Sequence, residues 1–383
     1  MVTISCLTKF HAFALAEQMN KNNCLTLFHT GFAGQAIPWL AKFSSRLDSE
    51  KIESSRIITH PVLGLAAKGI PHDYFWLGKF DLMVSKSLKF DSSSVFVGWS
   101  GASLESIREA KRFGKLTILE RGSSHILYQN RILKEEYSRF GQLFKINDIT
   151  ISRELLEYEE ADYISVPSIF VFNSFVSFGI PQSKLLLNPY GASQYFFPTK
   201  RSNKKFRILY LGPLILRKGV PYLFEALYNL KIDSELYEVW FIGTVFDELK
   251  PIIEKYIRSN WHFLGYKIHS ELSTLISQCD IMVHPSIEEG LSMVIPQVLS
   301  CGVPVIATTN TGGDMLIREN ENGFIVPIRN AKAIEERLQY LFENKLELQR
   351  IQRNTLLTPN LTWDDYGNKY LTNLDKIVKE KNK

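Results

Sequence analysis

Short runs rich in β-branched residues alternate with longer helical patterns along the whole chain, and this alternation constrains the fold more than any other feature of the sequence. Strand-like runs include VTIS from residue 2, FRILYLG from residue 206 and IMVHPS from residue 281. Amphipathic stretches such as LESIREAKRFG, from residue 104, lie between such runs. Strands that alternate with helices form parallel sheets, because each parallel connection needs a crossover that a helix can supply. The sequence therefore predicts an α/β fold.

The alternation breaks near residues 188–205 and then starts afresh. The sequence NPYG from residue 188 is typical of a turn, and the polar run at 199–205 is typical of a linker. We therefore expect two doubly wound, Rossmann-like domains, at residues 1–192 and 193–362, that face each other across a cleft. In such sheets, ligands bind beyond the carboxyl ends of the strands.

The composition excludes several classes of function. Lys and Arg number 45 against 40 Asp and Glu, and the excess is spread over both halves, so we expect no nucleic-acid partner. The N-terminus has no basic region followed by an apolar run, and the longest apolar stretch, at 169–180, is too short and too polar to span a bilayer. We therefore expect a cytoplasmic protein.

The four cysteines form no Cys-x-x-Cys pair, which indicates core residues in a reducing compartment: Cys6, Cys24, Cys279 and Cys301.

The segment HPSIEEGLSMVIPQVLSCG, from residue 284, predicts a strand, a turn and a helix. Pro296 is tolerated only near a helix start, so we expect the helix to begin near Ser292. The loop before it would then present backbone N–H groups that favour an anion such as phosphate. Gly290 would let a ligand approach the backbone, and Glu289 could accept hydrogen bonds from sugar hydroxyls. Together these groups suit a nucleotide sugar.

This segment resembles the retaining glycosyltransferases of family 4 (glycosyl transferases group 1), which have the two-domain GT-B fold. The family motif has Glu before Gly, a second Glu eight positions later, Gly-x-Pro-Val-Ile and Gly-Gly. The resemblance continues through NGFIVP at 322–327 and GPLILRKG at 212–219, and it covers essentially all of the second half. The matching positions of the motif are Glu289, Gly290, Gly302, Pro304, Val305, Ile306, Gly312 and Gly313.

The resemblance implies a donor site for a UDP- or GDP-linked sugar, with no further cofactor. Glu289 would contact the donor sugar, and the backbone amides of Gly290, Leu291, Ser292 and Met293 would hold the diphosphate. Gly265 and Tyr266 would lie beside the base, although simple packing is an equal alternative for Tyr266.

The second Glu of the motif binds the ribose in the family, and here that position is Gln297. An amide accepts from one hydroxyl and donates to the other, so we expect donor affinity to change by about 1 kcal/mol and the reaction to persist. A glycosidase would need paired carboxylates around the scissile bond, and the matching position offers none.

The segment GPLILRKG carries the cations that would neutralise the departing diphosphate. Lys218 matches the family's lysine, but Pro213 occupies the position of the family's arginine. Arg217 is the candidate replacement, because a guanidinium grips phosphate oxygens bidentately. The alternative is a solvated basic pair at a helix start. With these cations in place, we expect a reaction that needs no metal ion.

Candidates on the acceptor side follow strands of the first half: Lys9 and His11 after the first strand, Ser100 at the end of another, and Arg121 and His125 after a third. By the resemblance, His125 would lie close to the reacting sugar and act as a catalytic residue, and a structural histidine is the alternative. A surface position is the alternative for His11. Arg121 would contact acceptor or phosphate, or else form a salt bridge to Glu120 or Glu105.

Two helices carry further expectations. The helix around residues 104–115 has a basic face, which suits either an anionic membrane surface or ordinary solvation. The basic side chains are Arg108, Lys111, Arg112 and Lys115. By the resemblance, the last helix, at 363–383, would pack back onto the first domain.

The sequence thus favours a retaining, metal-independent, hexosyltransferase-type enzyme that moves a sugar from a nucleotide donor to a saccharide or lipid-linked acceptor, in polysaccharide biosynthesis. One alternative is a nucleotide-sugar epimerase of the same architecture, which would convert its nucleotide sugar without an acceptor. Another is a non-catalytic, sugar-nucleotide-binding partner of a transferase, which would bind without turnover.

Overall fold

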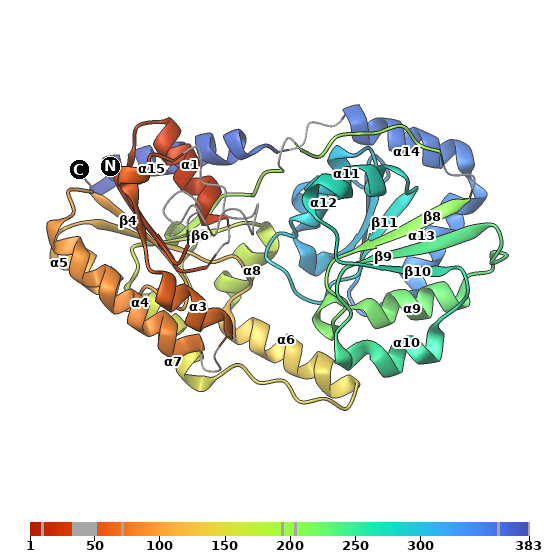
Figure 1. Ribbon diagram of the computed structural model, residues 1–383, viewed down its shortest axis with the longest axis horizontal. Coiled ribbons are helices and arrows are strands. Elements are labelled where there is room, and N and C mark those ends of the chain that lie inside the picture. The colour runs from red at the N-terminus through yellow and green to blue at the C-terminus, as the bar shows by residue number, and fades with distance from the viewer. Residues whose placement is uncertain are drawn as a thin grey trace.

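The computed structural model describes residues 1–8, 11–32, 52–69, 73–192, 195–202, 205–357 and 361–381. Its described strands form two sheets, one of seven strands and one of six, and every strand pairing within them is parallel. Figure 1 shows the sheets side by side, each covered by helices. The prediction of two Rossmann-like sheets is therefore confirmed.

The six strands of the second sheet follow the same order as the first six strands of the first sheet, to which β7 is added. The first has the order β3-β2-β1-β4-β5-β6-β7 and the second the order β10-β9-β8-β11-β12-β13. In each, the strand order reverses beside the first strand, so β1 adjoins β4 and β8 adjoins β11. Ligands of doubly wound sheets bind beyond the carboxyl ends of the strands at this reversal.

The strands of the first sheet are β1 (Val2–Cys6), β2 (Leu25–Thr30), β3 (Ile57–Thr59), β4 (Val95–Trp99), β5 (Leu116–Glu120), β6 (Tyr163–Val166) and β7 (Leu185–Leu187). Those of the second are β8 (Phe206–Leu211), β9 (Tyr237–Ile242), β10 (Trp261–Gly265), β11 (Ile281–His284), β12 (Val305–Thr308) and β13 (Gly323–Val326).

The helices of the first half are α1 (Ala12–Lys21), α3 (Pro61–Gly69), α4 (Asp73–Ser87), α5 (Leu104–Arg112), α6 (Ile126–Arg139), α7 (Asp148–Glu160) and α8 (Ile169–Ser177). Those of the second half are α9 (Val220–Asn229), α10 (Lys250–Tyr256), α11 (His269–Ser277), α12 (Val294–Ser300), α13 (Ala331–Glu343), α14 (Lys345–Leu357) and α15 (Trp363–Lys381). Short 3-10 turns include η5 (Leu216–Lys218) and η7 (Thr309–Thr311).

Each sheet is buried on both faces, which explains why its strands read as continuous apolar runs. In β4, Val95 and Val97 join the core on one face of the first sheet, and Phe96 joins the core on the other. The second sheet divides in the same way, with Ile208 and Leu209 of β8 in different cores.

The last helix returns to the first sheet. α15 packs on α1, and its Tyr366 and Leu374 lie in the same core as Val95. The chain passes between the two halves twice, near Ala192 and near Leu361. These two crossings lie side by side, because the Ala192 amide donates to the Leu361 carbonyl at 2.7 Å.

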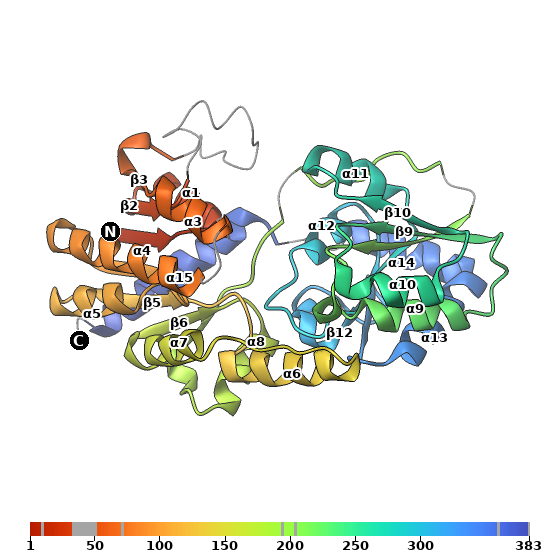
Figure 2. The ribbon, with the colours of Figure 1, turned by 60° about the horizontal axis from the view of Figure 1, so that its bottom comes forward.

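α6 joins the two halves. It follows β5 in the first half, and Figures 1 and 2 show it extending from there toward the helices of the second half. Its Ile132 and Leu133 pack with Ile287, from the loop after β11, in a small apolar cluster. This contact holds the carboxyl edges of the two sheets close together.

Among the helices that the structure describes, none has the length and the continuous apolar character needed to cross a bilayer. All four cysteines are free, and three of them, Cys6, Cys279 and Cys301, are buried.

Candidate active site between the two sheets

The loop after β11 brings Glu289 against Lys218, at the end of η5. The Lys218 ammonium forms an ion pair with Glu289 Oε1, and the Ser286 hydroxyl donates to the same oxygen at 3.1 Å. His284 Nε2 lies 3.6 Å from that oxygen. Burial would raise the pKa of Glu289, but Lys218 and then His284 hold that pKa well below its usual range. The sequence predicted that Glu289 and Lys218 share a site, and the structure brings them together.

A glycine lets the two loops that carry Lys218 and Glu289 approach each other. Gly219 follows Lys218 with φ of +63°, and a Cβ there would lie 1.9 Å from the Pro285 carbonyl oxygen. Only glycine accepts both the left-handed conformation and so close an approach. The Ile287 amide then donates to the Arg217 carbonyl at 2.9 Å, which ties the turn after β8 to the loop after β11.

The loop that carries Glu289 also touches the first half of the chain. A Cβ on Gly290 would lie 2.0 Å from the Gly122 carbonyl oxygen, so the two backbones pass in direct contact. The Ser168 hydroxyl donates to the Gly290 carbonyl at 2.6 Å, and the Leu291 side chain packs in the core of the first sheet. The candidate donor loop therefore lies between the two sheets.

The start of α12 differs slightly from the prediction. The helix begins at Val294, two residues after Ser292, and Pro296 lies in its first turn, where its missing N–H costs little. The Ser292 amide donates to the Thr311 carbonyl at 3.0 Å and is thus already engaged. The predicted diphosphate contacts consequently depend on the amides of Gly290, Leu291 and Met293.

The remaining donor-side candidates lie along the same edge of the second sheet. Gln297 is a half-buried residue of α12, one helical turn after Met293. Gly265 ends β10, the edge strand of the sheet, and Tyr266 follows it with 54% of its surface exposed.

Arg217 is directed toward the interface between the sheets. Its guanidinium forms an ion pair with Glu288 Oε2 at 2.7 Å, donates from Nε to the Glu288 carbonyl at 3.1 Å, and donates from Nη2 to the Ser123 hydroxyl at 3.3 Å. Pro213, where the family has arginine, accepts a hydrogen bond at its carbonyl from Tyr210. Whether Arg217 replaces that arginine toward phosphate stays a prediction.

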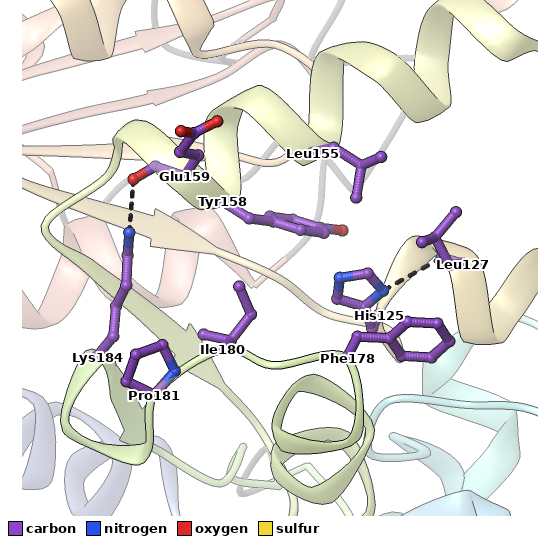
Figure 3. A pocket seen from close by; sticks show the side chains of 9 residues that line it. All are labelled: His125, Leu127, Leu155, Tyr158, Glu159, Phe178, Ile180, Pro181 and Lys184. Carbon is purple, nitrogen blue, oxygen red and sulfur yellow. Dashed lines mark hydrogen bonds between the residues drawn. The ribbon is translucent and has the colours of Figure 1, made fainter.

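His125 does not lie in the cleft, and the prediction that it does is wrong. Its backbone amide donates to the Ser174 hydroxyl at 2.9 Å, and its ring lies 5.0 Å from that of Phe175 in α8. The ring stacks on Phe178, with centroids 4.5 Å apart, beside Tyr158 in a pocket of about 320 Å³ (Figure 3). Its Nδ1 accepts from the Leu127 amide and caps α6. Burial, together with Arg121, lowers the pKa of His125 to about 4, so the ring is neutral and structural.

Arg121 is also structural, contrary to its prediction as an acceptor or phosphate contact. It is 8% exposed, pairs with Glu154 Oε2 at 2.9 Å and donates to the Ser124 carbonyl and the Gln129 side chain. A salt bridge was the predicted alternative, but its partner is Glu154 of α7, not Glu120 or Glu105.

Ser100 directly follows β4 and lies next to the start of α5, where carboxylates already accept hydrogen bonds from the backbone amides. The amides of Gly101 and Ser103 donate to the Glu157 carboxylate at 2.5 and 2.8 Å. The first turn of α5 also donates to the Asp81 carboxylate. Carboxylates from within the first half thus take the place that a substrate anion would occupy.

His11 is the acceptor-side candidate that packs beside Gly122 and pairs with Glu120. Its Nε2 is 2.8 Å from Glu120 Oε2, and its ring lies 4.2 Å from that of Tyr190. Its Cε1 lies 3.8 Å from a Cβ built on Gly122, the residue that touches Gly290. Lys9 lies outside the described residues.

The basic face of α5 is neutralised by neighbouring acids. Arg108 pairs with Glu105 and Glu160, Lys111 pairs with Asp162, and Arg112 pairs with Glu109. Lys115 is buried and donates to the Asp91 and Ser93 carbonyls. These pairs favour the second of the two alternatives for this helix, ordinary solvation of a basic face.

Glu288 is the residue that the sequence analysis missed. Its side chain is fully buried, and Ser123, Ser124, Gln129 and Arg217 surround its carboxylate. The sequence did contain a signal, the adjacent acids Glu288 and Glu289. Neighbouring side chains in a loop after a strand do not both face one ligand, so one of these two acids needs a different partner.

In the described part of the chain, no group of three or more His, Cys, Asp or Glu side chains is arranged to hold a metal ion.

Comparison with known proteins shows that the second half is similar to one family. Residues 192–356 match the model described as glycosyl transferases group 1. A putative colanic acid biosynthesis glycosyltransferase, WcaL of Escherichia coli (strain K12), is 25% identical over 172 residues, which are 42% of each chain. A putative glycosyltransferase, EpsD of Bacillus subtilis (strain 168), is 31% identical over 146 residues, 38% of each chain. The amylovoran biosynthesis glycosyltransferase AmsK of Erwinia amylovora is 22% identical over 278 residues, which are 69% of this chain and 64% of AmsK. The match thus spans about two-fifths of the length of WcaL and EpsD.

Solved structures resemble the whole chain. The sucrose-phosphate synthase of Thermosynechococcus elongatus superposes with a TM-score of 0.74 at 15% identity and covers 99% of both chains. Anabaena Alr3699/HepE, in complex with UDP-glucose, superposes with a TM-score of 0.68 at 14% identity and covers 98% of this chain and 99% of its own. At such identities the likeness establishes the GT-B fold and nothing finer.

Proposed function

We propose that this chain, a GT-B protein that belongs to the glycosyl transferases group 1 through residues 192–356, is a retaining glycosyltransferase that transfers a sugar from a nucleotide donor to an acceptor. The observation that carries the proposal is the Lys218–Glu289 ion pair, in the loops where the two sheets meet. It places a cation and a sugar-binding carboxylate side by side.

The pair suits a donor that has both a diphosphate and a sugar. Without a donor, the two charges neutralise each other, which is necessary because their side chains are only 17% and 12% exposed. A donor would separate them: Lys218 would meet the diphosphate, and Glu289 would accept from sugar hydroxyls. Negative charge grows on the diphosphate as its bond to the sugar breaks, so Lys218 would stabilise the transition state more than the bound donor.

We propose that the reaction needs no metal ion, because Lys218 supplies the positive charge beside the diphosphate. The displacement would take place on one face of the sugar, so that the acceptor replaces the diphosphate with retention of configuration. Activity in the presence of a strong chelator would support this part of the proposal, and loss of activity that Mg²⁺ or Mn²⁺ restores would refute it.

A UDP-linked donor is the first to test, with a GDP-linked donor as the alternative. HepE, which shares the fold over 98% of this chain, is described in complexes with UDP and with UDP-glucose. Gln297 would contact the ribose, and Tyr266 would lie beside the base. Tyr266 directly follows β10, and Gln297 lies in α12, which follows the loop that carries Glu289.

The setting we propose is the assembly of an extracellular polysaccharide on a saccharide or lipid-linked acceptor. The names of WcaL and AmsK refer to colanic acid and amylovoran biosynthesis. His11 is the proposed acceptor-side residue, because it lies beside Gly122, whose carbonyl meets Gly290.

A membrane-bound acceptor would need a lipid-facing surface, and α4 suits this role better than α5. Its exposed face alternates apolar and basic side chains: Phe75, Lys79, Leu82, Met83 and Lys86. The one acid among residues 74–87, Asp81, is buried and pairs with Arg153. Exposed apolar groups flanked by lysines favour an anionic bilayer, and α4 lies on the outer side of the first sheet, away from the second (Figure 1). We therefore propose that the protein is cytoplasmic and contacts the membrane peripherally.

A panel of UDP- and GDP-sugars tests the function. A bound donor at 100 times its dissociation constant should stabilise the fold by about 2.7 kcal/mol, which a thermal shift detects. Hydrolysis or transfer by the purified chain would then support a transferase. Conversion of the nucleotide sugar to its epimer would identify an epimerase, and binding without turnover in any acceptor mixture would identify a non-catalytic partner.

A further inference from the structure

The buried carboxylate of Glu288 links the two halves of the chain directly beside Glu289. Its Oε1 accepts from the Ser123 hydroxyl at 2.7 Å, the Ser124 amide at 3.0 Å and the Ser124 hydroxyl at 2.7 Å. Its Oε2 accepts from the Gln129 side chain at 3.2 Å and pairs with Arg217 at 2.7 Å. Apart from Arg217, all of these donors belong to the segment between β5 and the second turn of α6.

A carboxylate without solvent contact is costly unless hydrogen bonds and an opposite charge replace its lost water. Burial would raise the pKa of Glu288, but Arg217 and then the Ser123 and Ser124 groups bring that pKa below its ordinary value. Glu288 is thus ionised and fully coordinated. Its partners come from both halves of the chain, so it is satisfied only when the Ser123–Ser124 segment and the loop after β11 are in contact.

The residues of this contact adjoin both members of the candidate catalytic pair, Lys218 and Glu289, along the chain. Glu288 precedes Glu289, and Arg217 precedes Lys218, so each member of the Arg217–Glu288 pair is the chain neighbour of one member of the Lys218–Glu289 pair. The Glu289 amide is fixed separately, by donating to the Asn310 carbonyl at 3.0 Å. A shift of Glu288 away from Ser124 would therefore move Glu289 and Lys218 relative to the first half.

We infer that Glu288 is a positioning residue, which fixes the Ser123–Ser124 segment against the donor loop and thereby sets the placement of Glu289 and Lys218 for sugar transfer. The inference rests on the proposed function for its catalytic consequence. Its structural part, the coupling of two segments that lie 164 residues apart, stands without that function.

The matched control is a second buried carboxylate that pairs with a side chain of the other half. Glu136 of α6 is fully buried and accepts from Arg329 Nε at 2.6 Å. It lies seven residues after Gln129, about 10 Å farther along the helix. If Glu288 served only to hold the halves together, Glu136→Gln and Glu288→Gln should have the same consequences.

The kinetic test compares Glu288→Ala, Glu288→Gln and Glu136→Gln. We expect Glu288→Ala to lower kcat at least about tenfold, with the dissociation constant for UDP changed by less than about threefold, because the fully buried Glu288 side chain offers no surface to a nucleotide. Glu288→Gln should be intermediate, since one amide oxygen still accepts from Ser124 but no charge holds Arg217. Glu136→Gln should keep kcat within about twofold. An unchanged kcat in Glu288→Ala, or an equal loss in Glu136→Gln, would overturn the inference.

The Ser123→Ala/Ser124→Ala variant tests the same contact from the other side. Because it removes the hydroxyls that meet Glu288, its effect and that of Glu288→Ala should not add, and the combined variant should be within about twofold of Glu288→Ala alone. Multiplicative losses would show that the two sides act separately and would overturn the inference. If Glu288→Ala does not fold, Glu288→Gln takes its place in the cycle.

A measurement without turnover separates this inference from the proposed function. Amide hydrogen exchange should accelerate at least about tenfold in peptides that cover residues 121–125 and 286–292 of Glu288→Ala, and stay within about twofold of the parent in Glu136→Gln. Unchanged exchange would overturn the placement of Glu288 even in an active enzyme. Accelerated exchange in a chain that turns over no nucleotide sugar would leave the coupling intact and refute only the transferase.

Discussion

The Lys218 ammonium and the Glu289 carboxylate form an ion pair although they come from different loops, one after β8 and one after β11. The adjacent pairing of β8 and β11 places the two loops at one edge of the sheet, and Gly219 lets them touch. Each charge is the other's ion-pair partner. This relationship makes the consequences of changing either residue specific.

Replacing Glu289 should impair catalysis more than nucleotide binding. Glu289→Ala removes the carboxylate proposed to hold the sugar, so turnover should fall on the order of 100-fold while UDP, which lacks the sugar, still binds. Calorimetry with UDP and initial rates with the full donor measure the two effects. Glu321→Ala, which removes an exposed carboxylate of the same half, is the control. Parent-like turnover in Glu289→Ala would remove Glu289 from the site.

Changing Gln297 to the residue of the family motif tests the ribose contact. Gln297→Glu should keep activity and should bind UDP at least as tightly as the parent, because a carboxylate accepts from both ribose hydroxyls. Titration of both proteins with UDP checks this, and 2′-deoxy-UDP should remove any gain. A weaker UDP complex would mean that Gln297 does not meet the ribose.

His125 should govern the pH dependence of stability and not the rate of transfer. Its pKa is about 4 in the folded protein against an ordinary 6.5. Between these values the unfolded chain binds the proton and the folded chain does not, so the free energy of unfolding falls as pH falls through this window, by about 3 kcal/mol in all. His29, with its pKa also lowered to about 4 by burial and by His60, acts in the same direction.

The variant His125→Asn isolates this contribution, because Asn also caps a helix but does not titrate. Urea midpoints at pH 7.5 and pH 5 should differ less in the variant than in the parent, and turnover at pH 7.5 should stay within about threefold. A loss of turnover on the order of 100-fold, with the fold intact, would return His125 to the catalytic site.

The fold and the centre of the site could be predicted from the sequence, because both depend on local patterns. Strand–helix alternation determines where the carboxyl ends of strands meet, and the family resemblance carried by two short segments implied that Lys218 and Glu289 share a site there. The rest depends on contacts between distant segments. His125 packs against Phe175 and Phe178 of a later segment, and Glu288 accepts a hydrogen bond from Ser124, 164 residues earlier. No local pattern carries such information.

The exposed face of α4 should bind anionic vesicles. The parent should sediment with phosphatidylglycerol vesicles at low salt and much less with phosphatidylcholine vesicles, because the lysines need anionic headgroups. Leu82→Glu/Met83→Glu should abolish sedimentation by placing charge in the apolar stripe. Leu346→Glu/Leu357→Glu changes two leucines of α14 that are 82% and 79% exposed, and should behave as the parent does. Equal loss in both variants, or parent binding to both lipids alike, would contradict the proposed surface.

Lys218 and Arg217 should both lower the barrier to departure of the diphosphate, and Glu288 allows their parts to be separated. Lys218→Ala should raise the barrier by about 2–4 kcal/mol in single-turnover experiments at saturating donor, as expected for loss of one charge-stabilising group. Arg217→Ala should also slow the reaction. In a chain that keeps Glu288, however, this substitution also removes the ion-pair partner of the Glu288 carboxylate. The informative comparison is therefore made in the Glu288→Ala background. If Arg217 replaces the arginine that Pro213 displaced, Arg217→Ala should slow that background at least about tenfold further, and Arg217→Lys should recover only part of the loss, since an ammonium cannot grip phosphate bidentately. If Arg217→Ala has no further effect there, Arg217 acts only through Glu288, and the site works with Lys218 as its cation.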